Sequence, residues 1–330
     1  MFKNGAYYNG IGPYLKEKFG MRIAKVSVDG GFTCPNRDGT AGFGGCIFCS
    51  ESGSGDFAGT RILGPETAAD GRSRFTGSAE NLRPVPPVAA QMEAQIGALR
   101  KKWGDFRCIA YFQNFTNTYA PVPALKERFE AALEHPLCAG LAVATRPDCL
   151  GDDVLDYLSE LNERTFLWVE LGLQTADEDS ARYIRRGYPF SVYEEAVKKL
   201  SHRGIPAVTH LIAGLPGEDR DTFLRSVSRT VSGGIFGIKL QLLHIMKSTD
   251  LGGLWQKNPA AVPVLEKEEY ISLIADALEI IPPQITIHRL TGDAPKDLLL
   301  APLWSRDKKS VLNGINMELK KRGSCQGSRV

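Results

Sequence analysis

A strand–helix–strand pattern in the middle of the chain decides the fold class: "FLWVELGLQ" at 166–174, "SVYEEAVKKLSHRG" at 191–204 and "AVTHLIAGLP" at 207–216. The outer segments are almost continuously apolar, as are strands buried on both faces of a parallel sheet. The middle segment has helical spacing, with Ser191 expected as its N-cap and Gly204 as its terminator. Two such strands joined by a helix form a right-handed βαβ unit.

The same alternation continues on both sides of this unit. Further apolar runs lie at 24–31, 107–114, 141–148 and 238–246, and helical patterns lie at 88–103, 122–135, 149–163 and 220–234. About six βα units predict an α/β fold, a partial (β/α)6 barrel of the TIM type with parallel strands. A doubly wound open sheet is the alternative.

The two ends of the alternation suggest the domain organisation. Residues 1–250 are predicted to form the partial-barrel core, with 70–87 as a loop insertion inside the Gly-, Ser- and Pro-rich segment 50–87. Residues 251–330 are predicted to form a C-terminal extension packed on the barrel. It contains helical patterns at 266–281 and 307–322 and a strand pattern at 284–292.

The composition limits the setting of the protein. Of 330 residues, 43% are hydrophobic and 24% are charged, which is typical of a globular protein. No apolar run approaches the roughly 18 residues of a membrane span, and the first residues do not resemble a signal peptide. We therefore expect a cytoplasmic protein without membrane contact, in which clustered cysteines bind metal.

Net charge is a weak guide to partners. The formal value of +2 is too small to indicate nucleic-acid binding by itself. Basic residues nevertheless gather near the C-terminus, where they form either a solvated helix face or a phosphate-binding patch. They are Arg306, Lys308, Lys309, Lys320, Lys321, Arg322 and Arg329.

The cysteine-rich segment "CPNRDGTAGFGGCIFC" at 34–49 follows the first strand pattern and holds Cys34, Cys46 and Cys49. Its glycines allow the backbone to approach an inorganic group closely. A structural zinc site takes four ligands, and the other cysteines are scattered singly, so zinc is the weaker alternative. Three thiolates on a [4Fe-4S] cluster would leave one iron open for chemistry.

This three-cysteine segment resembles the site of the radical S-adenosylmethionine (radical SAM) superfamily. The usual spacing there is C-x3-C-x2-C, whereas this chain has C-x11-C-x2-C, which is similar to the Elongator-like branch and to YhcC-type proteins. The resemblance implies a [4Fe-4S] cluster on Cys34, Cys46 and Cys49, with S-adenosyl-L-methionine (SAM) at the open iron. It places Phe48 against the SAM adenine.

The resemblance also assigns residues after the second and third strands. The usual Gly-Gly-Glu motif is replaced by "QNFTNTYAP". Its polar residues are expected to bind the SAM amine, although a capped turn would use the same residue types. Thr145, beside Arg146 and Asp148, lies at the next strand end; Asp148 could instead cap the following helix. The expected amine-binding residues are Gln113, Asn114, Thr116 and Asn117.

The remaining assignments come from the later strands. "ELGLQ" and "YIRRGYP" resemble motifs of oxygen-independent coproporphyrinogen oxidase. The resemblance implies that Gln174 contacts the SAM ribose and that Arg186 pairs with the SAM carboxylate. Glu170, a charge within an apolar strand, needs either a ligand or a barrel arginine as partner. His210, Gly214 and Leu215 are expected near the ribose and adenine. Residues without an assigned role on the substrate side are His244, His288, Arg289 and Trp304.

The implied function is that of a radical SAM enzyme that receives electrons from a flavodoxin- or ferredoxin-type one-electron reductant. Three hypotheses about the function stay open. The Elongator-like spacing and the basic C-terminus favour RNA, particularly tRNA. Compactness and the near-neutral charge favour a small molecule or a peptide. A zinc-stabilised binding protein without catalysis is the third.

Overall fold

One curved sheet of seven parallel strands forms the centre of the computed structural model, which describes all residues except 1, 3–4, 51–52 and 54–81. The strand order is β1-β2-β3-β4-β5-β6-β8 and never reverses, unlike that of a doubly wound sheet. The predicted partial barrel is therefore confirmed. The strands are β1 (Ile23–Val28), β2 (Arg107–Phe112), β3 (Cys138–Thr145), β4 (Phe166–Gln174), β5 (Ala207–Ala213), β6 (Gly237–Leu242) and β8 (Thr286–Arg289).

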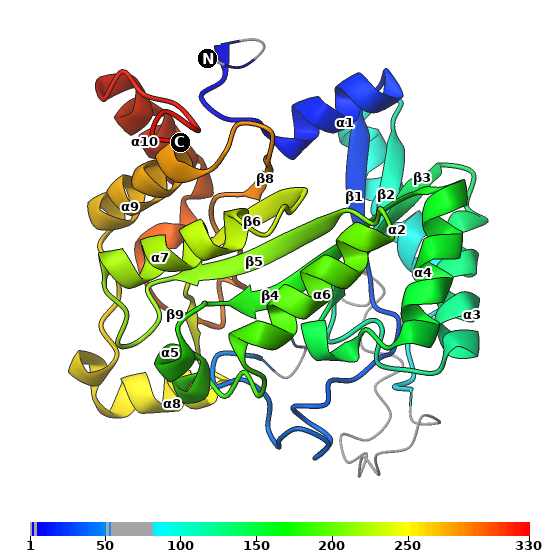
Figure 1. The fold of residues 1–330 in the computed structure, drawn as a ribbon, viewed down its shortest axis with the longest axis horizontal. Coiled ribbons are helices and arrows are strands. Elements are labelled where there is room, and N and C mark those ends of the chain that lie inside the picture. The colour runs from blue at the N-terminus through cyan, green and yellow to red at the C-terminus, as the bar shows by residue number, and fades with distance from the viewer. Residues whose placement is uncertain (1, 3–4, 51–52, 54–81) are drawn as a thin grey trace.

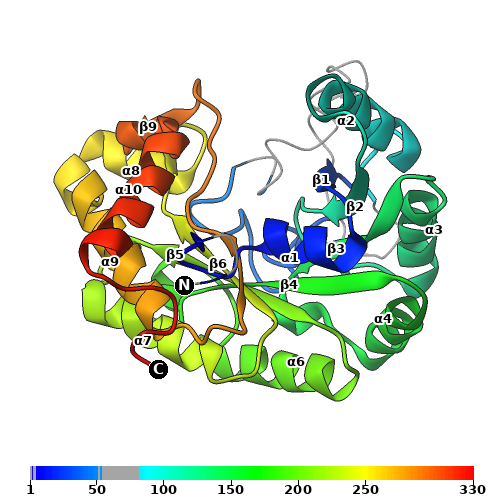
Figure 2. The same ribbon diagram turned by 90° about the horizontal axis from the view of Figure 1, so that it is seen from above.

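Helices cover the outer face of the sheet, and Figure 2 shows them along the outside of its arc. The main core lies between them and the sheet, with Leu141, Val169 and Leu240 fully buried. The helices are α2 (Val88–Trp103), α3 (Val122–Leu133), α4 (Asp152–Arg164), α6 (Phe190–His202), α7 (Arg220–Val231), α9 (Lys267–Ile280) and α10 (Lys308–Lys321). Helix α6 begins at Phe190, directly after the extended Pro189, so Ser191 lies inside the helix and is not its N-cap.

Helix α1 (Ile11–Phe19), which the sequence patterns did not predict, closes the amino end of the half-barrel. Its Ile11 and Leu15 are buried against Trp168 and Ala142, residues from the inner side of the sheet. The backbone before it also joins the sheet edge, because Ile287 N donates to Asn9 O at 2.7 Å. Figure 2 shows α1 within the arc of helices. Helix α1 therefore covers the inner side of the sheet at the amino ends of the strands.

The C-terminal region contributes to the barrel itself. Strand β8, from the predicted extension, pairs in parallel with β6 and becomes the seventh strand. The segment between them contains β7 (Ile245–Met246) and α8 (Asp250–Lys257), and β7 pairs with β9 (Leu299–Ala301). Helices α5 (Glu178–Tyr183) and α8 lie at the carboxyl end, beside the cysteine segment (Figure 1).

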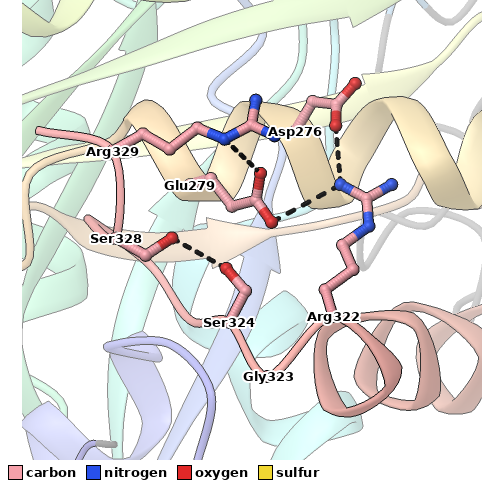
Figure 3. Close-up of a pocket in the computed structure, with 7 residues that line it drawn as sticks. All are labelled: Asp276, Glu279, Arg322, Gly323, Ser324, Ser328 and Arg329. Carbon is pink, nitrogen blue, oxygen red and sulfur yellow. Dashed lines mark hydrogen bonds and ion pairs between the residues drawn. The ribbon is translucent and has the colours of Figure 1, made fainter.

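Several basic residues near the C-terminus are bonded to acids of the same chain. Arg322 Nη1 lies 2.6 Å from Asp276 and 3.5 Å from Glu279, and Arg329 Nε lies 3.0 Å from Glu279 (Figure 3). Lys308 Nζ lies 2.6 Å from Asp293. These contacts fasten the tail and α10 to the barrel. They also neutralise much of the charge that the sequence presents as a basic cluster.

Two expectations concern other parts of the chain. Most of the predicted loop 50–87 and of the insertion 70–87 lies outside the described residues; residues 82–87 belong to no helix or strand. Among the residues that the structure describes, no helix is long and apolar enough to cross a membrane.

Candidate functional site

A cavity of about 470 Å³ opens at the carboxyl ends of the strands, where barrel enzymes build their active sites. It brings together residues from most of the chain. Eleven of the residues predicted from the sequence line it: Cys34, Cys46, Phe48, Cys49, Gln113, Thr116, Thr145, Glu170, Gln174, Arg186 and His210.

The cysteine segment is held at one end of this cavity by Ile47. Its side chain is buried in an apolar cluster with Ile184 and Leu251. Its backbone bonds both neighbours, since Ile47 N donates to Ile184 O at 3.2 Å and Leu251 N donates to Ile47 O at 2.9 Å. The buried Asn36 adds a bond from Nδ2 to Arg185 O. These contacts fix the positions of the flanking cysteines.

The three thiols differ in how their surroundings shift the pKa: that of Cys46 is lowered, whereas those of Cys34 and Cys49 are raised. A hydrogen bond from Cys49 lowers the pKa of Cys46 to about 7 against the opposing effect of burial, and Arg146 adds to the lowering. Burial raises the pKa of Cys34, which Arg146 partly offsets. Cationic groups beside thiols are typical of metal-binding and reactive cysteines.

The donor set suits an iron–sulfur cluster. Within the described residues, no three His, Cys, Asp or Glu side chains surround one point as the ligands of a single ion would. A four-iron cluster gives each thiolate its own iron, so its ligands need not converge. Asn36 Nδ2 lies 3.5 Å from Cys46 Sγ and offers the sulfur a hydrogen bond.

The backbone around the cavity is unusual. In the part of the chain that the structure describes, the non-glycine residues with positive φ are Phe115 (57°), Gln174 (67°) and Arg185 (59°). Phe115 and Gln174 line the cavity, and the carbonyl of Arg185 accepts from Asn36 beside Cys46. Such conformations cost energy and gather at functional sites. The positive φ of Gln174 coincides with a shift in the register between β4 and β5.

Arg186, which is expected at the SAM carboxylate, and the neighbouring Arg146 are both bonded to other groups of the chain. Arg186 is 1% exposed, and its guanidinium donates to the carbonyls of Tyr188 at 2.9 Å and Leu173 at 3.2 Å. Arg146 Nη1 donates to Arg186 O at 2.8 Å, and Arg146 Nη2 lies 2.6 Å from Asp148. Asp148 is therefore the partner of Arg146, whereas the N-cap of α4 is Gly151.

Four predicted site residues do not line the cavity. Asn114 Nδ2 donates to Asp29, directly after β1, at 2.8 Å, and Asn117 Nδ2 donates to Ala144 O in β3 at 2.8 Å, so both side chains bond the protein itself. Leu215 is buried in the apolar cluster around Ile47, and a Cβ at Gly214 would meet Leu265. Contacts of these four with SAM stay a prediction.

A buried ionic group forms the floor of the cavity. Glu170 is fully buried and accepts from Lys239 Nζ, from His210 Nε2 at 2.8 Å and from Trp168 Nε1 at 2.9 Å. Burial alone would raise the pKa of Glu170, but Lys239 and His210 outweigh it and hold the pKa well below its usual range. The sequence predicted a ligand or a barrel arginine as the partner of Glu170. In the structure Lys239 and His210 are its charged and hydrogen-bonding partners.

The four residues without an assigned role fall into two groups. His244 and Arg289 line the cavity. His288 Nε2 lies 3.0 Å from Thr286 Oγ1, and Trp304 Nε1 donates to Leu265 O at 3.1 Å. The sequence reasoning overlooked Asn36, Ile47 and Lys239. Only Lys239 carried a signal, as a lysine within the apolar run "IKLQLL".

Comparison with family models gives two matches. Residues 34–229 match the model of the radical SAM superfamily, and residues 235–321 match the radical SAM C-terminal domain. The first range begins at Cys34 and contains most of the cavity lining. The second covers β6, α9, β8 and α10.

Relatives extend over nearly the whole chain. YtqA of Bacillus subtilis is 45% identical over 320 residues, which cover 97% of this chain and 92% of YtqA. YhcC of Escherichia coli is 34% identical, covering 98% of this chain and 95% of YhcC. A tRNA uridine(34) acetyltransferase of Dehalococcoides mccartyi is 28% identical, covering 56% of this chain and 39% of that enzyme.

The fold also matches a solved structure. Archaeal Elp3 of Methanocaldococcus infernus superposes with a TM-score of 0.60 at 18% identity, covering 72% of this chain and 59% of that one. At this identity the likeness supports the half-barrel fold alone.

Proposed function

Because the chain belongs to the radical SAM superfamily and is an enzyme of that class, we propose that Cys34, Cys46 and Cys49 hold a [4Fe-4S] cluster with one iron open to SAM. The observation that carries this proposal is the meeting of the three thiols at one end of a cavity built from the strand ends. Arg37 and Arg146, close enough to act on the thiol pKa values, would balance the charge of the thiolates.

The chemistry supplied by the bound group is one-electron reductive cleavage of SAM to methionine and a 5′-deoxyadenosyl radical, which takes a hydrogen atom from the substrate. The chain's own residues would bind SAM, orient it and enclose it. Phe48 offers an aromatic face to the adenine, and Gln174 offers its amide to the ribose. SAM and substrate bound in this cavity would displace water from the reacting atoms.

Residues of the cavity wall would hold the methionine end of SAM. Gln113 and Thr116 lie after β2, beside the cysteine end, and present oxygen acceptors for its amine. Arg146 and Arg186 supply positive charge for its carboxylate, although both are already bonded to Asp148 or to backbone carbonyls. Their role is therefore electrostatic rather than that of free bidentate partners.

For the substrate we propose RNA, with tRNA as the first candidate. The support is the similarity to a tRNA uridine(34) acetyltransferase over about half of this chain. The basic C-terminal residues give less support, because Arg322, Arg329 and Lys308 are paired with acids of the same chain. An RNA substrate predicts tRNA binding that weakens steeply with salt.

Anaerobic purification and reconstitution test the cluster and its chemistry. Iron and sulfide near four per chain, with 5′-deoxyadenosine formed from SAM and dithionite, are the expected results for a [4Fe-4S] enzyme. Cys46→Ala should lose most of the iron and all detectable 5′-deoxyadenosine, because the cluster loses one of its three protein ligands.

Cys325→Ser is the matched control, since Cys325 lies in the C-terminal tail and outside the cavity lining. It should behave as the unaltered chain. Zinc in place of iron, or a Cys46→Ala variant that still makes 5′-deoxyadenosine, would contradict the proposal. A flavodoxin or ferredoxin should replace dithionite as the one-electron reductant.

A further inference from the structure

The cavity has a second end, away from the cysteines. Gln241 of β6, His244 after β6, Arg289 at the end of β8 and Asp293 line it. All four belong to the segment that matches the radical SAM C-terminal domain. The cluster and SAM as proposed above occupy the cysteine end, so this end is left for the substrate.

Charge around this second end is unbalanced. Lys25 and Lys239 lie on the same face of their strands as the cavity-lining Ser27 and Gln241, two residues further on. Burial lowers the pKa of both lysines, and Lys239 is paired with Glu170. Lys308 is paired with Asp293, so among the described residues Arg289 is left as a cation without a close carboxylate. Burial lowers the pKa of His244 to about 4, so that ring is neutral near pH 7.

Within the described part of the chain, Arg289 has only a distant charged partner. Its side chain is 25% exposed and lines the cavity. Among the described residues its guanidinium has one charged partner, Asp293 at 3.8 Å, which is too far for a hydrogen bond. Asp293 is bonded more closely to Lys308, at 2.6 Å. Arginine does not lose its proton in proteins, so this charge persists.

A second observation points to a missing polar partner. His244 Nε2 is buried and has no hydrogen-bond partner among the described residues. The His244 ring packs so closely on Gly292 that a Cβ there would lie 2.7 Å from the ring. The glycine thereby lets the ring lie in the cavity wall between β6 and Asp293.

We propose that this end of the cavity binds an anionic group of the substrate, a phosphate or a carboxylate, with Arg289 as its bidentate partner and His244 as a neutral hydrogen-bond donor or acceptor. The proposal rests on the proposed function for the assignment of this end to the substrate. An anion would offset the excess positive charge and supply the acceptor oxygens that the planar guanidinium lacks.

Inorganic phosphate is the probe for this site. Equilibrium dialysis with labelled phosphate uses the anaerobic holoenzyme, saturated with SAM and without reductant, so that the cysteine end is filled. Arg289→Gln removes the charge and should weaken phosphate binding by about 10- to 100-fold. Arg289→Lys keeps the charge but lacks the planar guanidinium. Its affinity for phosphate should lie between that of the unaltered chain and that of Arg289→Gln.

Arg203→Gln is the matched control. Arg203 follows α6, at the amino edge of the sheet and away from the cavity. This variant should bind phosphate like the unaltered chain. Equal binding by Arg289→Gln and the unaltered chain would overturn the proposal, and so would an equal loss in Arg203→Gln.

A second arm uses unfractionated tRNA and identifies the source of the anion. If the anion is an RNA phosphate, Arg289→Gln should reduce the slope of log K against log salt by about 0.7 to 0.9. An unchanged slope with weakened phosphate binding would support the anion site and overturn RNA phosphate as its ligand.

The cluster chemistry is measured separately in the same variants. The iron content and the circular dichroism of Arg289→Gln should equal those of the unaltered chain, which shows that the variant folds. Absence of 5′-deoxyadenosine in the unaltered chain would overturn the proposed function, whereas normal 5′-deoxyadenosine with unchanged phosphate binding would overturn the anion site alone.

Discussion

His210 shows how one residue in the cavity floor links burial to pH. Its ring bonds Glu170 at 2.8 Å, and its side chain is 15% exposed. Burial, reinforced by Lys239, lowers the pKa of His210 to about 4. In the unfolded chain the pKa is about 6.5. Between these values the unfolded chain binds the additional proton, so the free energy of unfolding falls as pH falls.

This difference predicts a measurable effect of His210→Gln. In the unaltered chain, His210 should cost about 2 kcal/mol of stability between about pH 7 and pH 5. The glutamine variant should lose correspondingly less stability over that range in urea unfolding. His202→Gln, at the exposed end of α6, is the control. The same pH dependence in His210→Gln and the unaltered chain would show that His210 does not titrate in this way.

At the scale of elements, the cysteine segment is held by packing as well as by its glycines. Ile47 is 6% exposed and lies between Ile184 of the α5 end and Leu251 of α8. Neither contact is visible in the spacing of the cysteines. The loop therefore depends on elements that follow it by more than a hundred residues.

Ile47→Ala should loosen the segment without removing a cluster ligand. Truncating a buried isoleucine costs about 2–5 kcal/mol, which favours local opening of the loop. We expect a chelator to remove iron from this variant at least about 10-fold faster than from the unaltered chain. The absorbance of the iron–chelator complex measures the rate. Phe43→Ala is the control, because Phe43 belongs to the same loop and is 79% exposed. Identical rates in both variants would show that Ile47 does not hold the loop.

At the scale of the whole molecule, the two ends of the chain meet across the edge of the barrel. Gln326 is 2% exposed; its Oε1 accepts from Asn9 N at 2.8 Å, and its Nε2 donates to Pro282 O and Ile285 O at 2.8 Å each. Asn9 in turn pairs with β8. One amide thus joins the N-terminal segment, the C-terminal tail and the last strand.

Gln326→Ala should leave these buried backbone groups without partners. The expected loss is about 1–3 kcal/mol in the free energy of unfolding, measured by urea titration. Ser328→Ala, an exposed position in the same tail, should change stability little. A loss of similar size in both variants would mean that the tail, rather than the Gln326 amide, carries the effect.

Much of the site could be predicted because its signals are local. Cys34, Cys46, Cys49 and Phe48 lie within one short segment, and the polar residues after each strand fall at one edge of any parallel sheet. Asn114, Asn117, Gly214 and Leu215 were predicted at the site but do not line the cavity. The sequence places these residues at strand ends, but it does not show whether they face the cavity. The division of the chain at residue 250 stays a prediction.

The sequence by itself determined the parallel half-barrel and the three-thiol segment, because apolar periodicity and cysteine spacing act between near neighbours along the chain. Only the tertiary structure decided that β8 is the seventh strand, that α1 closes the amino end, and that Lys239 compensates Glu170. It also decided that Arg289 faces the cavity. These outcomes depend on contacts between distant segments and on the turn of each loop, and no local pattern encodes them.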